Sequence, residues 1–484
     1  MEHSTLVLIS FIVYSLFIIS VGLYSTRRRK KTVADYVLAN RELGPWVSAF
    51  SASASAESGW VMLGLVGVAF TDGLAAFWIM PGIAAGYLFN WFVLAERLRK
   101  STVDTGAVTL PQYIMHRFGR SSSALRVVSI VIITAAMLGY VAAQMNAAGK
   151  AFDAVFELPY WLGVVAGAFI ILAYTVTGGF RAVAWTDLIQ ASFMVVALIG
   201  MPLLMLADVG GYSTAMYTLA AQNPELLTFS AGNTGWVLFG FVVGFLGIGL
   251  GYPGQPHVLA RFMAAKDTKT VREGGFIAFG WFFLVYVGAI FFGLFARAYF
   301  GDLADPEQAL PLATTELLPS VIAGFVIAAI VAAICSTADS QLIVVSSTFS
   351  RDVFRRDKGK AEHSPAEMRR YQLWDSGTLL VLGLISVFFA LTKNRVIFEF
   401  VLYAWAVLGA CFGPVVMLGL LWKRANKAGA LAGMITGLVV VLVWRNVTVL
   451  KSAVYELVPA FFLALLAMVV FSLATGKTDD ANRA

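Results

Sequence analysis

Hydroxyl and carboxylate side chains interrupt one apolar stretch of the chain at Ser336, Thr337, Asp339 and Ser340. A helix would place Ser336, Asp339 and Ser340 on one face, with Thr337 about 100° around from Ser336. Hydroxyls, a carboxylate and backbone carbonyls are hard oxygen ligands that suit a small hard cation, whereas a Cys/His cluster typical of zinc or iron is missing from this stretch. Each hydroxyl alone could bond the carbonyl one turn back. The grouping with an acid favours a cation site.

A second apolar stretch contains hydroxyls, small residues and one carboxylate. These residues are Ser48, Ser51, Ser53, Ser55, Glu57, Ser58 and Gly59. Poor helix formers that bond their own backbone permit local unwinding, which frees carbonyl oxygens to face a cavity. Close helix packing through small residues is the alternative. Glu57 weakens that alternative, because a carboxylate at membrane depth costs roughly 2.5 to 3.5 kcal/mol unless it is paired, wetted or near an interface.

Asp187 is a third polar point, beside Trp185, Thr186 and Gln190. It either caps a helix or lies beside an ion exit path. Tyr140 falls well inside an apolar stretch, which favours a cavity-lining role.

The run from Gly247 to His257 is rich in glycine and proline. It predicts a pliable cytoplasmic end of a membrane crossing, with His257, near Arg261, as a solvated loop residue.

The elements that must position these residues are membrane helices. With 59% hydrophobic and 13% charged residues and a mean hydropathy of +0.79, a water-soluble fold could not hide the apolar surface. Backbone groups lack water in hydrocarbon, and the short alternating segments of a barrel are absent, so the fold is predicted to be all-α and polytopic. Thirteen crossings are expected near residues 5–25, 46–70, 74–95, 124–149, 160–178, 184–207, 234–255, 274–299, 318–347, 373–392, 397–421, 427–446 and 452–474.

Basic residues set the orientation. All but six of the 35 Lys and Arg residues fall on the side of the first loop, which contains Arg27, Arg28, Arg29, Lys30, Lys31 and Arg41. The six on the other side are Lys150, Arg297, Lys393, Arg395, Arg445 and Lys451. The positive-inside rule then places the amino terminus outside and the carboxyl terminus in the cytoplasm. This asymmetry explains the net charge of +7, so no nucleic-acid partner is inferred.

Cys335 and Cys411 lie at membrane depth and indicate no disulfide framework. The first apolar segment has no basic flank before it and no small-residue cleavage site after it, which predicts a retained helix rather than a signal peptide. Crossings two to six (46–207) and seven to eleven (234–421) form two blocks of five in opposite orientation. Such inverted blocks are typical of alternating-access transporters with a site near the midplane.

Several phrases of the sequence resemble the sodium/solute symporter family, most closely its sodium/proline symporters. They are RELGP (41–45), SGW (58–60), GGFRAVAWTDLIQ (178–190), GLGYPGQPHVLARFMA (249–264), STADSQL (336–342), YAW (403–405) and GPVV (413–416). The resemblance implies a fold of the bacterial leucine-transporter type, in which one extra helix (5–25) precedes the repeats. Two extra helices (427–474) and a cytoplasmic tail (475–484) follow them.

The resemblance also implies the site residues. A sodium ion would be held by the backbone carbonyls of Ala54, Glu57 and Ala333 and by the hydroxyls of Ser336 and Thr337. The substrate would be surrounded by Ser58, Gly59, Trp60, Tyr140, Tyr252, Gln255 and Pro256. Arg41 and Asp187 would take cytoplasmic positions that affect ion and substrate passage.

Two positions depart from the sodium/proline pattern. Ala56 stands where those members carry Asp, with the acid one residue along at Glu57, and Ile248 stands where they carry Trp. The first departure affects sodium affinity, and the second removes an apolar wall from the proline pocket. Asp339, together with Asp187, Ser336 and Ser340, could form a second cation site.

The function predicted is a sodium-driven symporter in the bacterial cytoplasmic membrane. It would import a small neutral amino acid, with L-proline as first choice, and its other partners would be the co-transported sodium ion and the lipid bilayer. The alternatives are another amino acid, a carboxylate or a betaine-like osmolyte on the same fold, or a solute sensor that does not transport. An enzyme is not expected, because neither a nucleophile and base pair nor a metal-ligand cluster appears at depth. The oligomeric state stays open.

Overall fold

The computed structural model describes residues 2–26, 32–119, 122–353, 365–392 and 397–476. These residues form twenty α-helices, and the described ranges hold no β-strand beyond an isolated bridge between Leu43 and Ala265. The prediction of an all-helical membrane fold is confirmed.

The first ten helices are α1 (Glu2–Thr26), α2 (Val33–Leu38), α3 (Pro45–Gly59), α4 (Val66–Asp72), α5 (Ile79–Phe89), α6 (Ala95–Thr105), α7 (Leu110–Phe118), α8 (Ser123–Phe156), α9 (Tyr160–Asp208) and α10 (Tyr212–Gln222). The second ten are α11 (Gly235–Gly247), α12 (Pro256–Ala264), α13 (Thr268–Phe300), α14 (Ala309–Leu317), α15 (Ser320–Thr348), α16 (Pro365–Thr392), α17 (Ile397–Leu421), α18 (Lys427–Asn446), α19 (Thr448–Ala453) and α20 (Leu457–Ala474). Short 3-10 segments cover Ala39–Arg41, Gly73–Trp78, Pro224–Leu227, Ile248–Gly254 and Pro306–Gln308, and π-helical turns cover Trp60–Leu65, Asn90–Leu94 and Phe349–Val353.

Eleven helical runs of the described residues are long and apolar enough to cross a membrane. One of them, Pro45–Thr105, has 61 residues and cannot be straight. The hydroxyl of Tyr87 donates a 2.8 Å hydrogen bond to the carboxylate of Glu57, whereas residues 30 positions apart in a straight helix would be about 45 Å apart. The reversal lies at Gly73, which has a φ of 61° and whose added Cβ would lie 2.0 Å from the carbonyl oxygen of Leu226.

Helix α9 also folds back on itself. Its 49 residues contain one non-helical position, Gly179, with a φ of 62° and a ψ of −170°. Ile170 and Gln190, on either side of that position, line the same small cavity together with Tyr14. Twenty residues of straight helix would separate them by about 30 Å. The run therefore contains two antiparallel arms that meet near Gly179.

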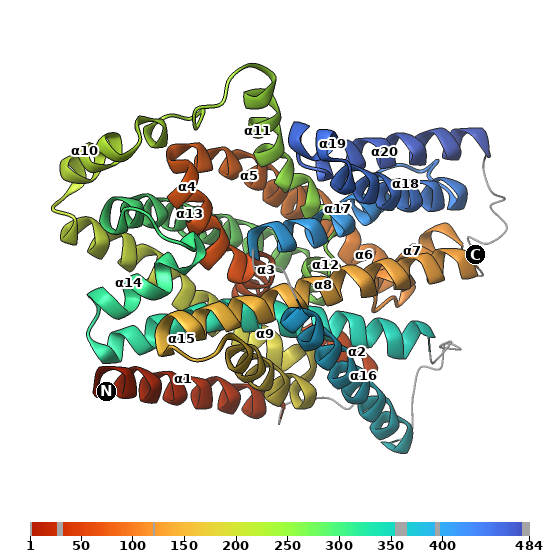
Figure 1. The fold of residues 1–484 in the computed structure, drawn as a ribbon. Coiled ribbons are helices and arrows are strands. Elements are labelled where there is room, and N and C mark those ends of the chain that lie inside the picture. The colour runs from red at the N-terminus through yellow and green to blue at the C-terminus, as the bar shows by residue number, and fades with distance from the viewer. Residues whose placement is uncertain (1, 27–31, 120–121, 354–364, 393–396, 477–484) are drawn as a thin grey trace.

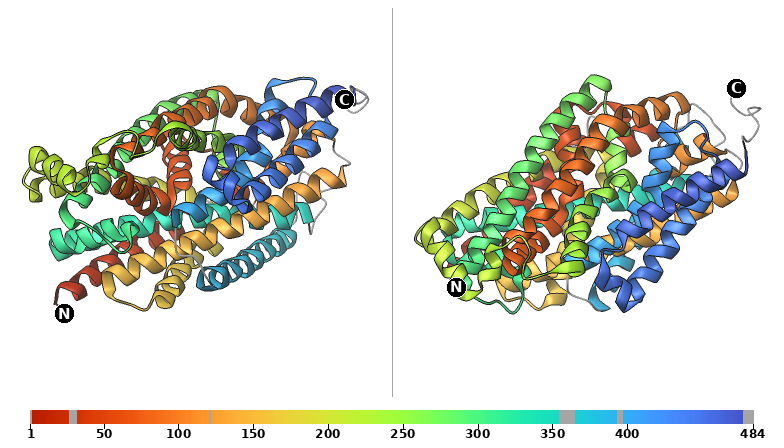
Figure 2. Two further views of the ribbon diagram at one scale, coloured as in Figure 1. Left: turned by 45° about the horizontal axis from the view of Figure 1, so that its top comes forward. Right: turned by 90° about the horizontal axis from the view of Figure 1, so that it is seen from above.

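The helices form one elongated bundle (Figures 1 and 2). The start of α1 and the end of α20 lie at opposite ends of it. Helices α15 and α17 occupy its interior, since 78% of the residues in their apolar windows are buried. Helices α1, α16, α18 and α20 bury 28% to 33% of theirs and cover the outside. Helix α15 packs against α3, α8 and α9. This packing brings the polar residues of α3 and α15 together at the centre of the bundle.

Candidate functional site

The helix α3 breaks at Ser58, where the sequence predicts unwinding. Ser58 has a φ of 43° and a ψ of −169°, a conformation that L-residues rarely adopt. The backbone groups beside the break find side-chain partners: Gly59 N donates to Gln144 Oε1 at 3.1 Å, and Trp60 N donates to Ser58 Oγ at 3.2 Å. Gln144 lies on α8, one turn beyond Tyr140. The predicted interruption of α3 is present.

The hydroxyls of α15 face the carbonyls of α3 just before this break. Ser336 Oγ donates to Ala54 O at 3.2 Å and to Ala333 O at 3.1 Å. Thr337 Oγ1 donates to Ala54 O and to Ser55 O, both at 3.1 Å. All of these residues are fully buried. The structure thus brings together four of the five residues predicted to hold sodium, namely Ala54, Ala333, Ser336 and Thr337.

Glu57, the fifth predicted ligand, has two separate roles in the structure. Its carbonyl accepts the backbone N–H of Trp60. Its buried carboxylate accepts hydrogen bonds from Tyr87 at 2.8 Å, from Tyr252 at 2.5 Å and from Tyr286. Sequence reasoning identified Tyr252 but missed Tyr87 and Tyr286. The signal for them was the acid itself, because a buried carboxylate requires hydrogen-bond donors.

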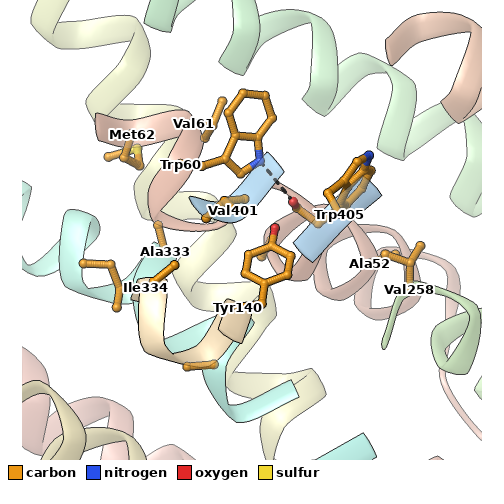
Figure 3. Packing of buried hydrophobic residues seen from close by; sticks show 14 of the residues in the cluster. Ala52, Trp60, Val61, Met62, Tyr140, Val258, Ala333, Ile334, Val401 and Trp405 are labelled. Atoms are coloured by element: carbon orange, nitrogen blue, oxygen red, sulfur yellow. Dashed lines mark hydrogen bonds between the residues drawn. The ribbon is translucent and has the colours of Figure 1, made fainter. Parts of the chain in front are cut away.

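Aromatic side chains surround the region beyond the α3 break. Figure 3 shows Tyr140 with its hydroxyl toward the space between Trp60 and Trp405. Trp60 Nε1 donates to Ala56 O at 3.3 Å, and the rings of Tyr252 and Trp405 meet edge to face with centroids 4.8 Å apart. The hydroxyl of Tyr140 is buried without a hydrogen-bond partner among the described residues. The site combines apolar ring surface with a buried phenol hydroxyl beside the α3 break.

The segment Ile248–Gly254 is a buried 3-10 turn rather than the loose end predicted from its glycines and prolines. Gly251 lies against Trp405, and an added Cβ would be 1.9 Å from Trp405 Nε1. That nitrogen donates to Ile248 O at 2.9 Å. Glycine is required here because the indole of α17 touches the backbone.

Gln255 bridges this turn to α17. Its Nε2 donates to Gly251 O and to Trp405 O, both at 3.1 Å, while its Oε1 is buried without a partner among the described residues. Pro256 then begins α12. The apolar run ends at Gly254, close to the predicted end of the crossing at residue 255, and the buried helix α12 (Pro256–Ala264) follows directly after Gln255.

This buried helix corrects the prediction for His257. The residue is fully buried in α12, with its ring 6.0 Å from that of Tyr140 between centroids, and is not a solvated loop residue. Arg261, one turn later, is also fully buried. Its Nε donates to Ser51 Oγ at 3.0 Å, and its Nη2 forms an ion pair with Asp187 Oδ2 at 3.1 Å. Sequence reasoning missed Arg261 because the residues after 255 were expected to form a solvated loop, whereas His257 and Arg261 are fully buried.

Asp187 does not cap a helix. It lies eight residues beyond Gly179 within α9, is fully buried, and accepts Ser51 Oγ at 2.6 Å in addition to Arg261. Ser340 Oγ contacts Arg261 Nη2 and lies 3.2 Å from Asp339 Oδ1. The residues of the predicted second cation site are therefore neighbours, with a guanidinium among them.

Arg41 lies between the first two crossings, where its guanidinium donates hydrogen bonds to several backbone carbonyl oxygens. It donates to Met263 O at 2.8 Å, to Thr102 O at 3.0 Å and to Ala107 O at 2.7 Å. Burial, together with the neighbouring Arg99, lowers the pKa of Arg41 to about 10. At neutral pH the guanidinium is therefore still charged as it ties α6 to α12.

Comparison of the sequence with known families and proteins identifies the family of the chain. The profile of the Sodium:solute symporter family matches residues 36–437. The chain is 36% identical to the sodium/proline symporter of Escherichia coli, over 99% of this chain and 95% of that protein. The chain belongs to the sodium:solute symporter family. The resemblance drawn from the motifs is thereby confirmed, and the symporter is an integral membrane protein that couples solute movement to sodium.

Two further comparisons agree with this assignment. The symporter is 35% identical to the osmoregulated proline transporter OpuE of Bacillus subtilis, over 98% of this chain and 96% of that protein. Among solved structures it is similar to a Na⁺-coupled sialic acid symporter in a substrate-bound outward-open state, with a TM-score of 0.81, 20% sequence identity, and coverage of 97% and 98% of the two chains. That similarity shows that the two share a fold.

A buried ion pair of the symporter lies away from the α3 break. Lys150, predicted in an outside loop, is buried at the end of α8 and pairs with Glu307 at 2.5 Å and with Asp305 at 2.8 Å. Glu307 also accepts the backbone N–H groups of Ile397 and Phe398, at 3.1 and 2.9 Å. One carboxylate thus holds α8 to the start of α17.

We expect Glu307→Gln to lower the thermal midpoint of the purified protein by several degrees, because hydrogen bonds to charged groups are worth about 1.5–3 kcal/mol each. Size-exclusion of heated samples in detergent measures the midpoint. Asp305→Asn is the matched control: Asp305 is one-third exposed, so its loss should matter less. Equal midpoints for Glu307→Gln and the unmodified protein would contradict this role.

Proposed function

We propose that the symporter imports L-proline together with sodium across the bacterial cytoplasmic membrane by alternating access. The observation that carries this proposal is the cluster of oxygens between α3 and α15, which lies directly before the break of α3 at Ser58. The names of the relatives support the cargo, since they include a sodium/proline symporter and an osmoregulated proline transporter.

Sodium would be held by the carbonyls of Ala54, Glu57 and Ala333 and the hydroxyls of Ser336 and Thr337. Both hydroxyls now donate to Ala54 O. When sodium binds, each hydroxyl would rotate so that its proton no longer points at Ala54 O. A lone pair of its oxygen would then face the ion. Because the ligands come from α3 and α15, the ion would tie the two helices together.

The substrate would lie beyond the α3 break, among Ser58, Gly59, Trp60, Tyr140, Tyr252, Gln255 and Pro256. The rings of Trp60, Tyr140 and Tyr252 offer an apolar wall for a pyrrolidine ring, together with Trp405, whose ring contacts Tyr252. The hydroxyl of Tyr140 and the Oε1 of Gln255 are buried polar atoms without partners among the described residues. Groups of this kind bind the charged ends of an amino acid and set its orientation.

Sodium and substrate would reinforce each other through the same segment. The ion fixes the residues before Ser58 and the substrate contacts the residues after it, so each ligand favours the conformation that binds the other. One charge crossing 100 mV supplies about 2.3 kcal/mol, and a tenfold sodium gradient about 1.4 kcal/mol. Together these support accumulation of the substrate by a few hundredfold.

The proposal also includes thirteen crossings. Ten of them form two inverted blocks of five (46–207 and 234–421). The helix 5–25 precedes these blocks, and the helices 427–474 follow them. The reversal at Gly73 divides the run Pro45–Thr105 into two crossings, and the apolar helix Tyr160–Ala173 becomes the first arm of α9. The placement of the start of α1 and the end of α20 at opposite ends of the bundle supports an odd number.

An outside amino terminus and a cytoplasmic carboxyl terminus follow from the distribution of basic residues. Several residues on which that count depends lie outside the described residues, namely Arg27, Arg28, Arg29, Lys30, Lys31, Lys393, Arg395 and most of the tail 475–484.

A competition panel tests the cargo. Uptake of labelled L-proline by cells that express the symporter is measured against an excess of other neutral amino acids, carboxylates and betaines. Proline itself should compete best, because aromatic rings surround the proposed substrate site. Stronger competition by a betaine or a carboxylate would show that the cargo is not proline. The presence of Ile248, where the sodium/proline symporters carry Trp, would then explain the different cargo.

A further inference from the structure

We propose that the side-chain amide of Gln144 recognises the carboxylate of the substrate at the break of α3. This inference rests on the proposed function and deepens it, because it names a residue that makes the symporter select a substrate with a carboxylate. Gln144 lies on α8, one turn beyond Tyr140, and is fully buried. Its amide contacts the chain where Ser58 meets Gly59.

The backbone of α3 fixes the orientation of this amide. Gly59 N donates to Gln144 Oε1 at 3.1 Å. A backbone N–H can only donate, so the oxygen of the amide must face Gly59 and the NH₂ group must take the other side. The approach is close, since a Cβ added to Gly59 would lie 3.1 Å from Gln144 Oε1 and 2.9 Å from Ile334 Cγ1. Glycine at this position therefore lets the amide reach the backbone.

The NH₂ group has a donor to spare. Gln144 Nε2 donates one long hydrogen bond, at 3.5 Å, to Ser58 Oγ. An amide nitrogen carries two N–H groups, and the described residues supply no acceptor for the other one. Buried polar groups are nearly always hydrogen-bonded, so this N–H is suited to an acceptor that a ligand brings.

Ser58 adds a second donor beside the amide. Its Oγ accepts Gln144 Nε2 and also Trp60 N, the latter at 3.2 Å. A hydroxyl has two lone pairs and one proton. With both lone pairs engaged, Ser58 has only its O–H left to offer. The two side chains at the break thus present donors, an N–H and an O–H, and no unused acceptor.

Neutral donors of this kind suit a carboxylate, because hydrogen bonds to an ionised group are about twice as strong as those between neutral groups. The acid of this region, Glu57, is bonded by tyrosines of α5 and α13, whereas Gln144 comes from α8. A zwitterionic amino acid would therefore direct its carboxylate toward Gln144 and its ammonium toward Glu57. Because the amide is uncharged, it does not repel the sodium ion proposed at Ala54, one turn earlier in α3.

The test compares two ligands on the purified full-length protein in sodium at neutral pH. L-Prolinamide keeps the ring and the amine of L-proline but has a neutral amide in place of the carboxylate. Equilibrium dialysis of each labelled ligand gives its dissociation constant, and the unmodified protein should prefer proline by about tenfold or more. Gln144→Glu keeps an oxygen for Gly59 N but exchanges the donor for a negative charge. It should weaken proline binding by about a hundredfold or more and leave prolinamide binding unchanged or tighter.

Two further variants separate recognition from a structural role. Gln144→Met keeps the length of the side chain without the donor, and it should weaken proline binding by about tenfold and prolinamide binding less. This variant decides alone if Gln144→Glu does not fold. Asn146→Asp is the matched control, because it makes the same exchange in a buried amide of α8 that accepts Tyr160 instead of the α3 break. It should leave the ratio of the two dissociation constants unchanged.

The outcomes are distinct for the inference and for the proposed cargo. Equal losses of proline and prolinamide binding in the Gln144 variants would show that Gln144 only supports the backbone, and would overturn the inference while the cargo stands. A larger loss for proline, confined to Gln144, would support it. If the unmodified protein binds no proline in sodium, the proposed cargo is wrong and the inference is overturned with it.

Discussion

Replacing Thr337 with alanine raises the sodium concentration needed for half-maximal uptake by about tenfold to a hundredfold, because a ligand to a charged group is worth roughly 1.5–3 kcal/mol. The hydroxyl of Thr337 bonds Ala54 O and Ser55 O, so its oxygen lies where α15 meets α3 before the break. Loss of this oxygen would weaken the proposed sodium site and leave the aromatic residues of the proposed substrate site in place. The effect should therefore appear as a sodium dependence.

The measurement is the initial rate of labelled proline uptake over a range of sodium concentrations, at saturating proline. Thr337→Ser retains the oxygen and is the matched control, with a sodium requirement close to that of the unmodified protein. Thr314→Ala removes a buried threonine hydroxyl that bonds only its own helix, at Leu310 O, and controls for general damage. An unchanged sodium requirement in Thr337→Ala would remove Thr337 from the ion site.

Replacing Glu57 with glutamine reduces uptake about a hundredfold or more, because the exchange disturbs a buried acceptor for three phenol groups. Tyr87 and Tyr252 donate to one carboxylate oxygen and Tyr286 donates to the other. Glutamine has one carbonyl oxygen and an amide group that only donates, so at least one tyrosine loses its acceptor. Tyr252 would then shift, and its ring lies against Trp405 in the proposed substrate site.

The dependence of uptake on proline concentration measures this effect. Tyr87→Phe is the matched control, since it removes one hydrogen bond and keeps the carboxylate, and it should cost about tenfold or less. Protein amounts in the membrane are compared by immunoblot, so that a folding defect is separated from a transport defect. Normal proline affinity and rate in Glu57→Gln would show that the three-tyrosine cluster is unnecessary for transport.

The sequence predicted the parts of the site that depend on local chemistry. Ser58 lies in a run of serines and small residues that compete with helical hydrogen bonds, and the helix breaks there. Ser336 and Thr337 share one turn of a helix beside an acid, and their hydroxyls do meet the carbonyl of Ala54. These features follow from residue type and helical spacing, which a single sequence contains.

The parts that the sequence left open depend on which helices become neighbours. Tyr87 and Tyr286 approach Glu57 from α5 and α13, and hydropathy does not order helices in space. Arg261 was missed for a different reason. Glycine and proline normally end a helix, and the residues after 255 were expected in a solvated loop. Instead Pro256 begins the buried helix α12, which carries an arginine into the core.

The most direct measurement is proline uptake by proteoliposomes that contain only the purified symporter. With sodium outside and potassium inside, and an inside-negative potential set by valinomycin, labelled proline should accumulate well above its external concentration. It should only equilibrate slowly when choline replaces sodium outside. Accumulation of the same size under choline, or none when both the sodium gradient and the potential are imposed, would contradict the account.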